Sequence, residues 1–158
     1  MSSLSRLSGF LGLTLLALPP LAAQKVPDLT GTWVMALDKS DFGPLPAPQS
    51  RTDVIVHKEP SITDQRTVVS TNGETTSTLV YAVDGKPHVN HIGGIDATSV
   101  LHWDGQVLVM ESTLTTPQGE VKAVDRYTLS ADQKTLTQAR TLSLGGQEAT
   151  QTIVMVKQ

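Results

Sequence analysis

Apolar and polar residues alternate in short runs along most of the chain after residue 30. An alternation with a period of two is typical of a β-strand that buries one face. Between the runs stand dipeptides rich in Gly, Asn and Asp, whose backbones tolerate the positive φ of a two-residue hairpin turn. They are Asn72-Gly73, Asp84-Gly85, Asp104-Gly105, Gln118-Gly119, Asp132-Gln133 and Gly145-Gly146.

The pattern predicts about ten strands, joined mostly by hairpins and therefore antiparallel. We expect them at residues 30–37, 51–58, 62–70, 74–83, 86–92, 95–103, 106–115, 120–129, 135–144 and 147–157. The Pro-rich segment 43–48 separates the first two strands and can be neither helix nor sheet interior. Because the later connections are too short for crossovers between two sheets, an all-β, up-and-down antiparallel β-barrel is favoured over a sandwich.

The first 23 residues do not follow the strand pattern. Arg6 is their only charge, the run 10–18 is apolar, and Pro19-Pro20 precedes the small residues at the end of the segment. This is the pattern of a secretory signal peptide. We expect a signal peptide over residues 1–23, cleavage near Ala23-Gln24, and one barrel domain over residues 24–158 that is secreted or periplasmic.

Charge and composition narrow the partners. The formal net charge is −3 and the chain has no cysteine; loss of Arg6 would change the charge from −3 to −4. A mildly acidic domain without a basic run is a poor candidate for binding nucleic acid or an anionic membrane surface. No stable membrane insertion and no cofactor are predicted.

The segment Asp28-Leu29-Thr30-Gly31-Thr32-Trp33 opens the first expected strand. Gly31-x-Trp33 at the start of an antiparallel meander resembles the entry motif of the lipocalin and fatty-acid-binding-protein (calycin) superfamily. The segments 37–44, 124–130 and 134–137 look like those of a group of small exported bacterial lipocalin-like proteins. The resemblance implies a barrel of about 8–10 strands with an internal cavity. It also implies that a basic side chain from a late strand, Arg126 or Arg140, lies across the Trp33 ring at the closed end.

The chain departs from the superfamily in two ways. There is no helical lid between the first strands, and the final strand lacks the Arg-x-Tyr pair of the intracellular fatty-acid carriers. Their carboxylate clamp therefore cannot be carried over.

Strand parity selects candidate interior residues. In 135–144, Leu136, Gln138 and Arg140 share a face with two further leucines, so we expect both polar side chains inside. A buried guanidinium needs a carboxylate, carbonyls, an aromatic ring or a ligand anion. Arg140 is thus either part of the closed end or, with Gln138, part of a ligand site.

A second candidate site is the segment between Asp84-Gly85 and Gly93-Gly94, which contains His88, Asn90 and His91. At a barrel rim these side chains could bond to an entering ligand, or the histidines could simply face solvent. His88 and His91 are three residues apart on a strand and point to opposite faces, so no metal site is predicted.

No nucleophile elbow, phosphate loop or zinc-helix motif occurs, so no catalytic residue is assigned. The predicted function is binding of a small apolar or amphipathic ligand inside the barrel, without catalysis. The alternatives are an interaction or inhibitor module with a filled barrel and recognition by rim loops, and a small barrel isomerase or hydrolase.

Overall fold

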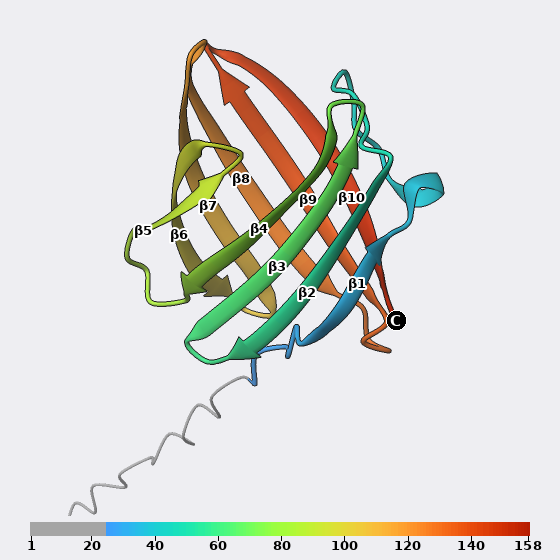
Figure 1. Ribbon diagram of the computed structural model, residues 1–158. Coiled ribbons are helices and arrows are strands. Elements are labelled where there is room, and N and C mark those ends of the chain that lie inside the picture. The colour runs from blue at the N-terminus through green and yellow to red at the C-terminus, as the bar shows by residue number, and fades with distance from the viewer. Residues whose placement is uncertain (1–24) are drawn as a thin grey trace, which may run out of the picture.

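One continuous antiparallel sheet of ten strands winds into a nearly closed barrel in the computed structural model, which describes residues 25–158 (Figure 1). The expected signal peptide, 1–23, and its cleavage site lie outside the described residues. The strands are β1 (Gly31–Met35), β2 (Ser50–Lys58), β3 (Ser61–Ser70), β4 (Gly73–Ala82), β5 (His88–Ile92), β6 (Ile95–Asp104), β7 (Val107–Thr116), β8 (Gly119–Leu129), β9 (Thr135–Leu144) and β10 (Gln147–Lys157).

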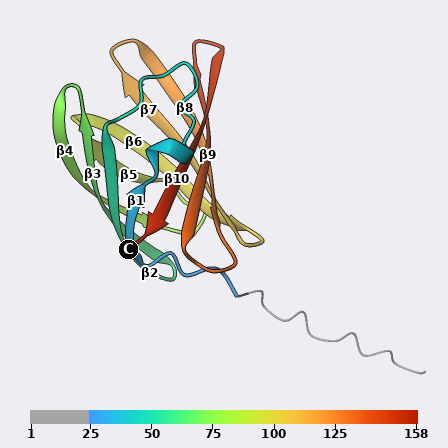
Figure 2. The ribbon, with the colours of Figure 1, turned by 90° about the vertical axis from the view of Figure 1, so that its right-hand side faces the viewer.

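The up-and-down barrel is confirmed by the order of the strands, β4-β3-β2-β1-β10-β9-β8-β7-β6-β5. Consecutive strands pair except β4 and β5, which form the two edges of the sheet, and β1 also pairs with β10, which lies beside it in Figure 2. The one helical element within residues 25–158 is a 3-10 turn at Leu37–Lys39. No helix in this part of the chain is long and apolar enough to span a bilayer.

We call the end of the barrel with the turns after β3, β5, β7 and β9 the upper end, as it is drawn in Figure 1, and the opposite end the lower end. The apolar core fills the lower part, because the inward side chains there are large and apolar. Its most buried members include Trp33, Leu79, Leu101, Leu108, Leu136 and Met155.

Trp33 closes the lower end as the Gly-x-Trp motif implies, but its basic partner is Lys157. The indole Nε1 donates a hydrogen bond to the Leu29 carbonyl at 2.9 Å, and Lys157 Nζ lies 5.2 Å from the centre of the ring. Gly31, with φ of +149°, makes room: a Cβ there would lie 2.5 Å from Lys157 Cε.

The expectation that Arg126 or Arg140 covers the Trp33 ring is therefore wrong. Arg126 lies on the outside of the barrel and pairs with Asp104, whereas Arg140 pairs with Asp125 in the interior. The final strand ends beside β1, so the last lysine of the chain is nearer to the ring than either arginine.

The two edges of the sheet, β4 and β5, are joined by a side chain rather than by a backbone ladder. Asn90 in β5 accepts a hydrogen bond from the Val80 N–H at 2.8 Å and donates one to the Val80 carbonyl at 3.0 Å. This amide replaces one rung of a ladder. Since β5 has five residues and β4 has ten, the upper half of β4 is left without a partner on this side.

We expect Asn90→Ala to loosen this seam specifically. The substitution removes both hydrogen bonds and leaves the Val80 backbone groups unpaired, which should cost about 1–3 kcal/mol in the free energy of unfolding. Hydrogen exchange at the Val80 amide should accelerate. The matched control is His91→Ala, which changes the exposed residue next to Asn90. An unchanged exchange rate of the Val80 amide in Asn90→Ala would contradict the role of Asn90 in joining β4 and β5.

Candidate functional site

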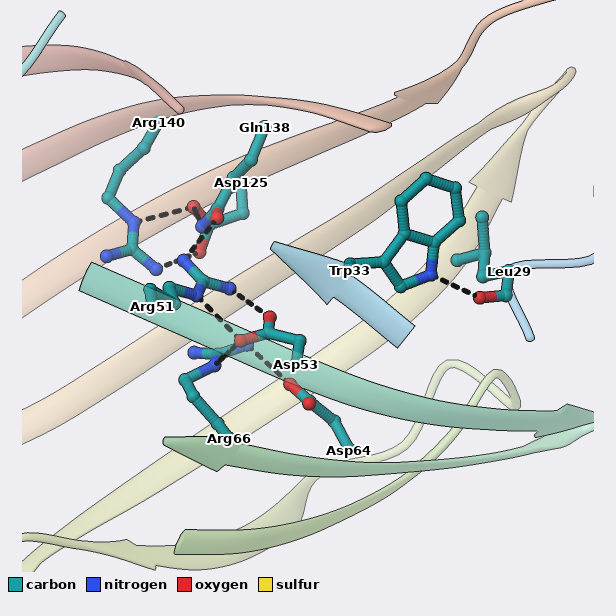
Figure 3. A network of polar contacts seen from close by, with 9 residues as sticks. All are labelled: Leu29, Trp33, Arg51, Asp53, Asp64, Arg66, Asp125, Gln138 and Arg140. Atoms are coloured by element: carbon teal, nitrogen blue, oxygen red, sulfur yellow. Dashed lines mark hydrogen bonds and ion pairs between the residues drawn. The ribbon is translucent and has the colours of Figure 1, made fainter. Parts of the chain in front are cut away.

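A chain of charged side chains crosses the interior of the barrel above the apolar core (Figure 3). It contains three guanidinium groups, three carboxylates and one amide. In order of contact its members are Asp64, Arg66, Asp53, Arg51, Gln138, Asp125 and Arg140. We call these seven residues the interior network.

On β2 and β3, two arginines share two carboxylates. Arg51 binds Asp53 in bidentate fashion, with Nε donating to Oδ1 at 2.9 Å and Nη2 donating to Oδ2. Arg66 lies opposite Asp53 in the strand register, with its Nε 3.3 Å from Asp53 Oδ1, and its Nη2 donates to Asp64 Oδ2 at 2.6 Å. The pairing neutralises all four charges locally.

On β8 and β9, Asp125 accepts three hydrogen bonds. Two come from Arg140, from Nε at 2.6 Å and Nη2 at 3.1 Å, and the third comes from Gln138 Nε2 at 2.7 Å. Arg140 is directly opposite Asp125 in the register of the two strands. Asp125 is thus a fully satisfied buried carboxylate.

Gln138 joins the two halves of the interior network. Its Oε1 accepts a hydrogen bond from Arg51 Nη1 at 2.9 Å, while its Nε2 donates to Asp125. In the sheet β2 and β9 are separated by β1 and β10, so the Arg51–Gln138 bond spans the inside of the barrel. The network therefore cross-links strands of the barrel wall that are not neighbours in the sheet.

The charges of the network control the protonation of its members. Burial disfavours the charged form of Arg66, but the carboxylates of Asp53 and Asp64 outweigh it and raise the pKa of Arg66 well above its ordinary value. Burial likewise opposes ionisation of Asp53, and here the positive charges of Arg66 and Arg51 prevail and lower its pKa. Arg66 and Asp53 therefore stay charged inside the barrel.

Three cavities adjoin the network: a small one of about 30 Å³ on the side of the apolar core, lined by Asp53, Asp64 and Arg66, and two larger ones above it. Of the two larger ones, the first, of about 190 Å³, lies against β5 to β9 and the second, of about 300 Å³, lies between the upper part of β3 and β4 and the tip of the β5–β6 hairpin. Arg66 and Ile92 line both. The apolar part of the first cavity includes Ile92, Met110, Leu114, Val121 and Leu142.

The guanidinium groups of the network are more exposed to this space than its carboxylates, although Asp125 also lines the first cavity. The side chains of Arg66 and Arg140 are 16% and 23% exposed, whereas those of Asp53, Asp64 and Asp125 are 1–4% exposed. Both arginines line the first cavity. Although the network is formally neutral, the surface that it offers to a ligand consists mainly of hydrogen-bond donors.

Of the residues predicted to bind a ligand, Arg140 reaches a cavity and Gln138 is fully buried in the network, as strand parity predicts. The structure does not bring His88, Asn90 and His91 to the same space. His88 bonds to Asp84, His91 is exposed and bonds to Asp96, and Asn90 holds the β4–β5 seam. Within residues 25–158 no three metal-ligating side chains gather at one point.

Five members of the network were not predicted as site residues: Arg51, Asp53, Asp64, Arg66 and Asp125. The strand alternation that predicts Arg140 inside the barrel could also have indicated residues on β2 and β3. Arg51 and Asp53 share a face with buried Ile55. Asp64 and Arg66 share a face with buried Ile62. In β2, however, the apolar residues Val54 and Val56 lie on the opposite face, and they favour that face as the buried one. They are 40% and 49% exposed.

Comparison with known proteins shows the fold alone. No protein family and no curated protein matches the sequence. Among solved structures, zebrafish ileal bile acid-binding protein complexed with cholic acid matches with a TM-score of 0.58 and 16% identity, over 82% of this chain and 98% of the other.

Two secretory abundant heat soluble proteins of Ramazzottius varieornatus match similarly. Protein 4 has a TM-score of 0.58 and 17% identity, over 86% of this chain and 99% of the other. The second has a TM-score of 0.61 and 11% identity, over 86% and 100%. The barrel that the Gly-x-Trp motif implies is thus shared with solved proteins.

We expect the interior network to be essential for stability. Asp125→Asn removes the charge that three donors share and leaves the Arg140 guanidinium without its carboxylate, which should cost about 3 kcal/mol in urea unfolding. Asp104→Asn breaks the exposed pair with Arg126 and should leave stability nearly unchanged. Equal losses in the two variants would contradict the role of the network.

Proposed function

We propose that the protein binds a small amphipathic molecule whose anionic group contacts Arg66 and Arg140 and whose apolar part lies in the upper cavities. The observation that carries the proposal is the donor surface that these two arginines present to the first cavity, where the one lining carboxylate, Asp125, is only 1% exposed and is paired with Arg140. Guanidinium groups bind carboxylate, sulfonate or phosphate oxygens with charge-assisted hydrogen bonds.

The walls of the cavity support an amphipathic ligand over a purely apolar one. Ile92, Met110 and Leu142 line the first cavity together with the two arginines. The two cavities, of about 190 and 300 Å³, share part of their lining. The second cavity has the size at which small-molecule sites begin, and the first is smaller. A purely apolar ligand would leave the arginine donors facing hydrocarbon.

The fold neighbours give further support. A bile acid-binding protein with cholic acid has the same barrel, and an acid of that kind combines the two properties that this cavity requires. We further propose that the ligand is bound outside the cytoplasm, after removal of residues 1–23. Support for export comes from the sequence pattern of that segment.

Calorimetry with three ten-carbon amphiphiles tests the proposed function. We expect 1-decanesulfonate to bind, 1-decanol to bind at least about tenfold more weakly, and decyltrimethylammonium to give no binding, because only the anion matches the donors. Equal affinity for the alcohol and the sulfonate would contradict an anion site.

Paired substitutions locate the site without leaving a buried charge alone. Arg140→Gln with Asp125→Asn removes one arginine and its carboxylate together, and should weaken decanesulfonate binding by about tenfold or more. Arg126→Gln with Asp104→Asn makes the same change on the outside of the barrel and should retain wild-type affinity. Loss of binding in both pairs would place the anion elsewhere.

A further inference from the structure

Asp64 is the least supported carboxylate of the interior network. Its Oδ2 accepts one hydrogen bond, from Arg66 Nη2, and its buried Oδ1 has no hydrogen-bond partner in the described part of the chain. By contrast, Asp125 accepts three hydrogen bonds, and Asp53 is held by the bidentate Arg51 and by Arg66. An ionised carboxylate with one partner is costly to bury.

The surroundings of Asp64 also favour its neutral form. Burial raises the pKa of Asp64 above its ordinary value, Arg66 offsets this only in part, and the negative charge of Asp53 adds to it. The other ionisable groups around this position are Arg51 on β2, Tyr81 on β4 and Tyr127 on β8. Asp53 has its own arginine, so Asp64 is the carboxylate of the pair that accepts a proton first.

Arg66 connects this carboxylate to the ligand site. It is the single hydrogen-bond donor to Asp64 and also lines both upper cavities. An anion bound there would place a third negative group on a guanidinium that already faces Asp53 and Asp64. Protonation of one carboxylate would remove its charge and so relieve the repulsion. Asp64 is the carboxylate with the fewest hydrogen bonds, so it is the one that we expect to take the proton.

We propose that Asp64 takes up a proton when an anion binds beside Arg66, so that the affinity of this site for anions rises as the pH falls. The inference rests on the proposed function, since it concerns the same anion site. For one coupled proton, linkage gives a change in Kd of up to about tenfold per pH unit. The slope flattens once Asp64 is already protonated in the free protein.

The experiment uses 1-decanesulfonate, whose sulfonate remains ionised throughout. Its Kd is measured by calorimetry from about pH 5 to about pH 8, in two buffers of different ionisation enthalpy that report proton uptake. For the wild-type protein we expect Kd to rise by about tenfold or more over this range, with uptake of up to one proton on binding.

Asp64→Asn carries no ionisable group at this position and should bind tightly with a Kd that no longer follows pH. Asp104→Asn, an exposed carboxylate, is the matched control and should retain the wild-type slope. A wild-type Kd that does not change with pH, or a slope that persists in Asp64→Asn, overturns the inference and leaves the anion site standing. Absence of binding at every pH overturns both.

A second measurement uses the wild-type protein alone and so does not require that a variant folds. The carboxyl carbon shift of Asp64 in the wild-type protein is followed by NMR through a pH titration, with and without saturating decanesulfonate. We expect the midpoint to move to higher pH when the anion is bound. A midpoint that stays in place overturns the proton coupling.

Discussion

Six charged side chains lie inside this barrel, and the cost of removing them from water shapes the rest of the structure. An isolated charge in such an interior is too costly to keep, so each guanidinium needs a carboxylate. Strand register supplies two of these pairs directly, Asp53 with Arg66 and Asp125 with Arg140. Gln138 bonds to Asp125 and to Arg51, which binds Asp53, and so connects the two pairs through the interior of the barrel.

The same pairing determines where the barrel is filled and which groups it presents to the proposed ligand. Below the network, Trp33 and the buried leucines fill the interior, whereas above it the long arginine side chains leave two cavities. Because the guanidinium groups are more exposed than the carboxylates, a neutral cluster acquires a surface that consists mainly of donors. The fold is shared with solved barrels, so the proposed ligand follows from these side chains and not from the barrel itself.

Sequence patterns predicted the barrel because hairpin turns and strand alternation are local properties, and parity alone placed Gln138 and Arg140 inside. Arg51 and Asp53 were not predicted because the apolar Val54 and Val56 on the opposite face of the same strand indicate that face as the inner one. In the structure Val54 and Val56 lie on the outer face, and Arg51 and Asp53 are buried. Contacts across the interior of the barrel cannot be predicted from local sequence patterns, because residues such as 51 and 138 are far apart in the sequence. For the same reason, Lys157 could not be identified as the partner of Trp33.

The central claim is that Arg66 and Arg140 hold the anionic group of a ligand above the apolar core. A crystal structure of the protein with 1-decanesulfonate tests it most directly. The account predicts sulfonate oxygens within about 3 Å of both guanidinium groups and the decyl chain against Met110 and Leu142. A sulfonate at the rim or on the outer surface, with both arginines bound to their carboxylates alone, would contradict it.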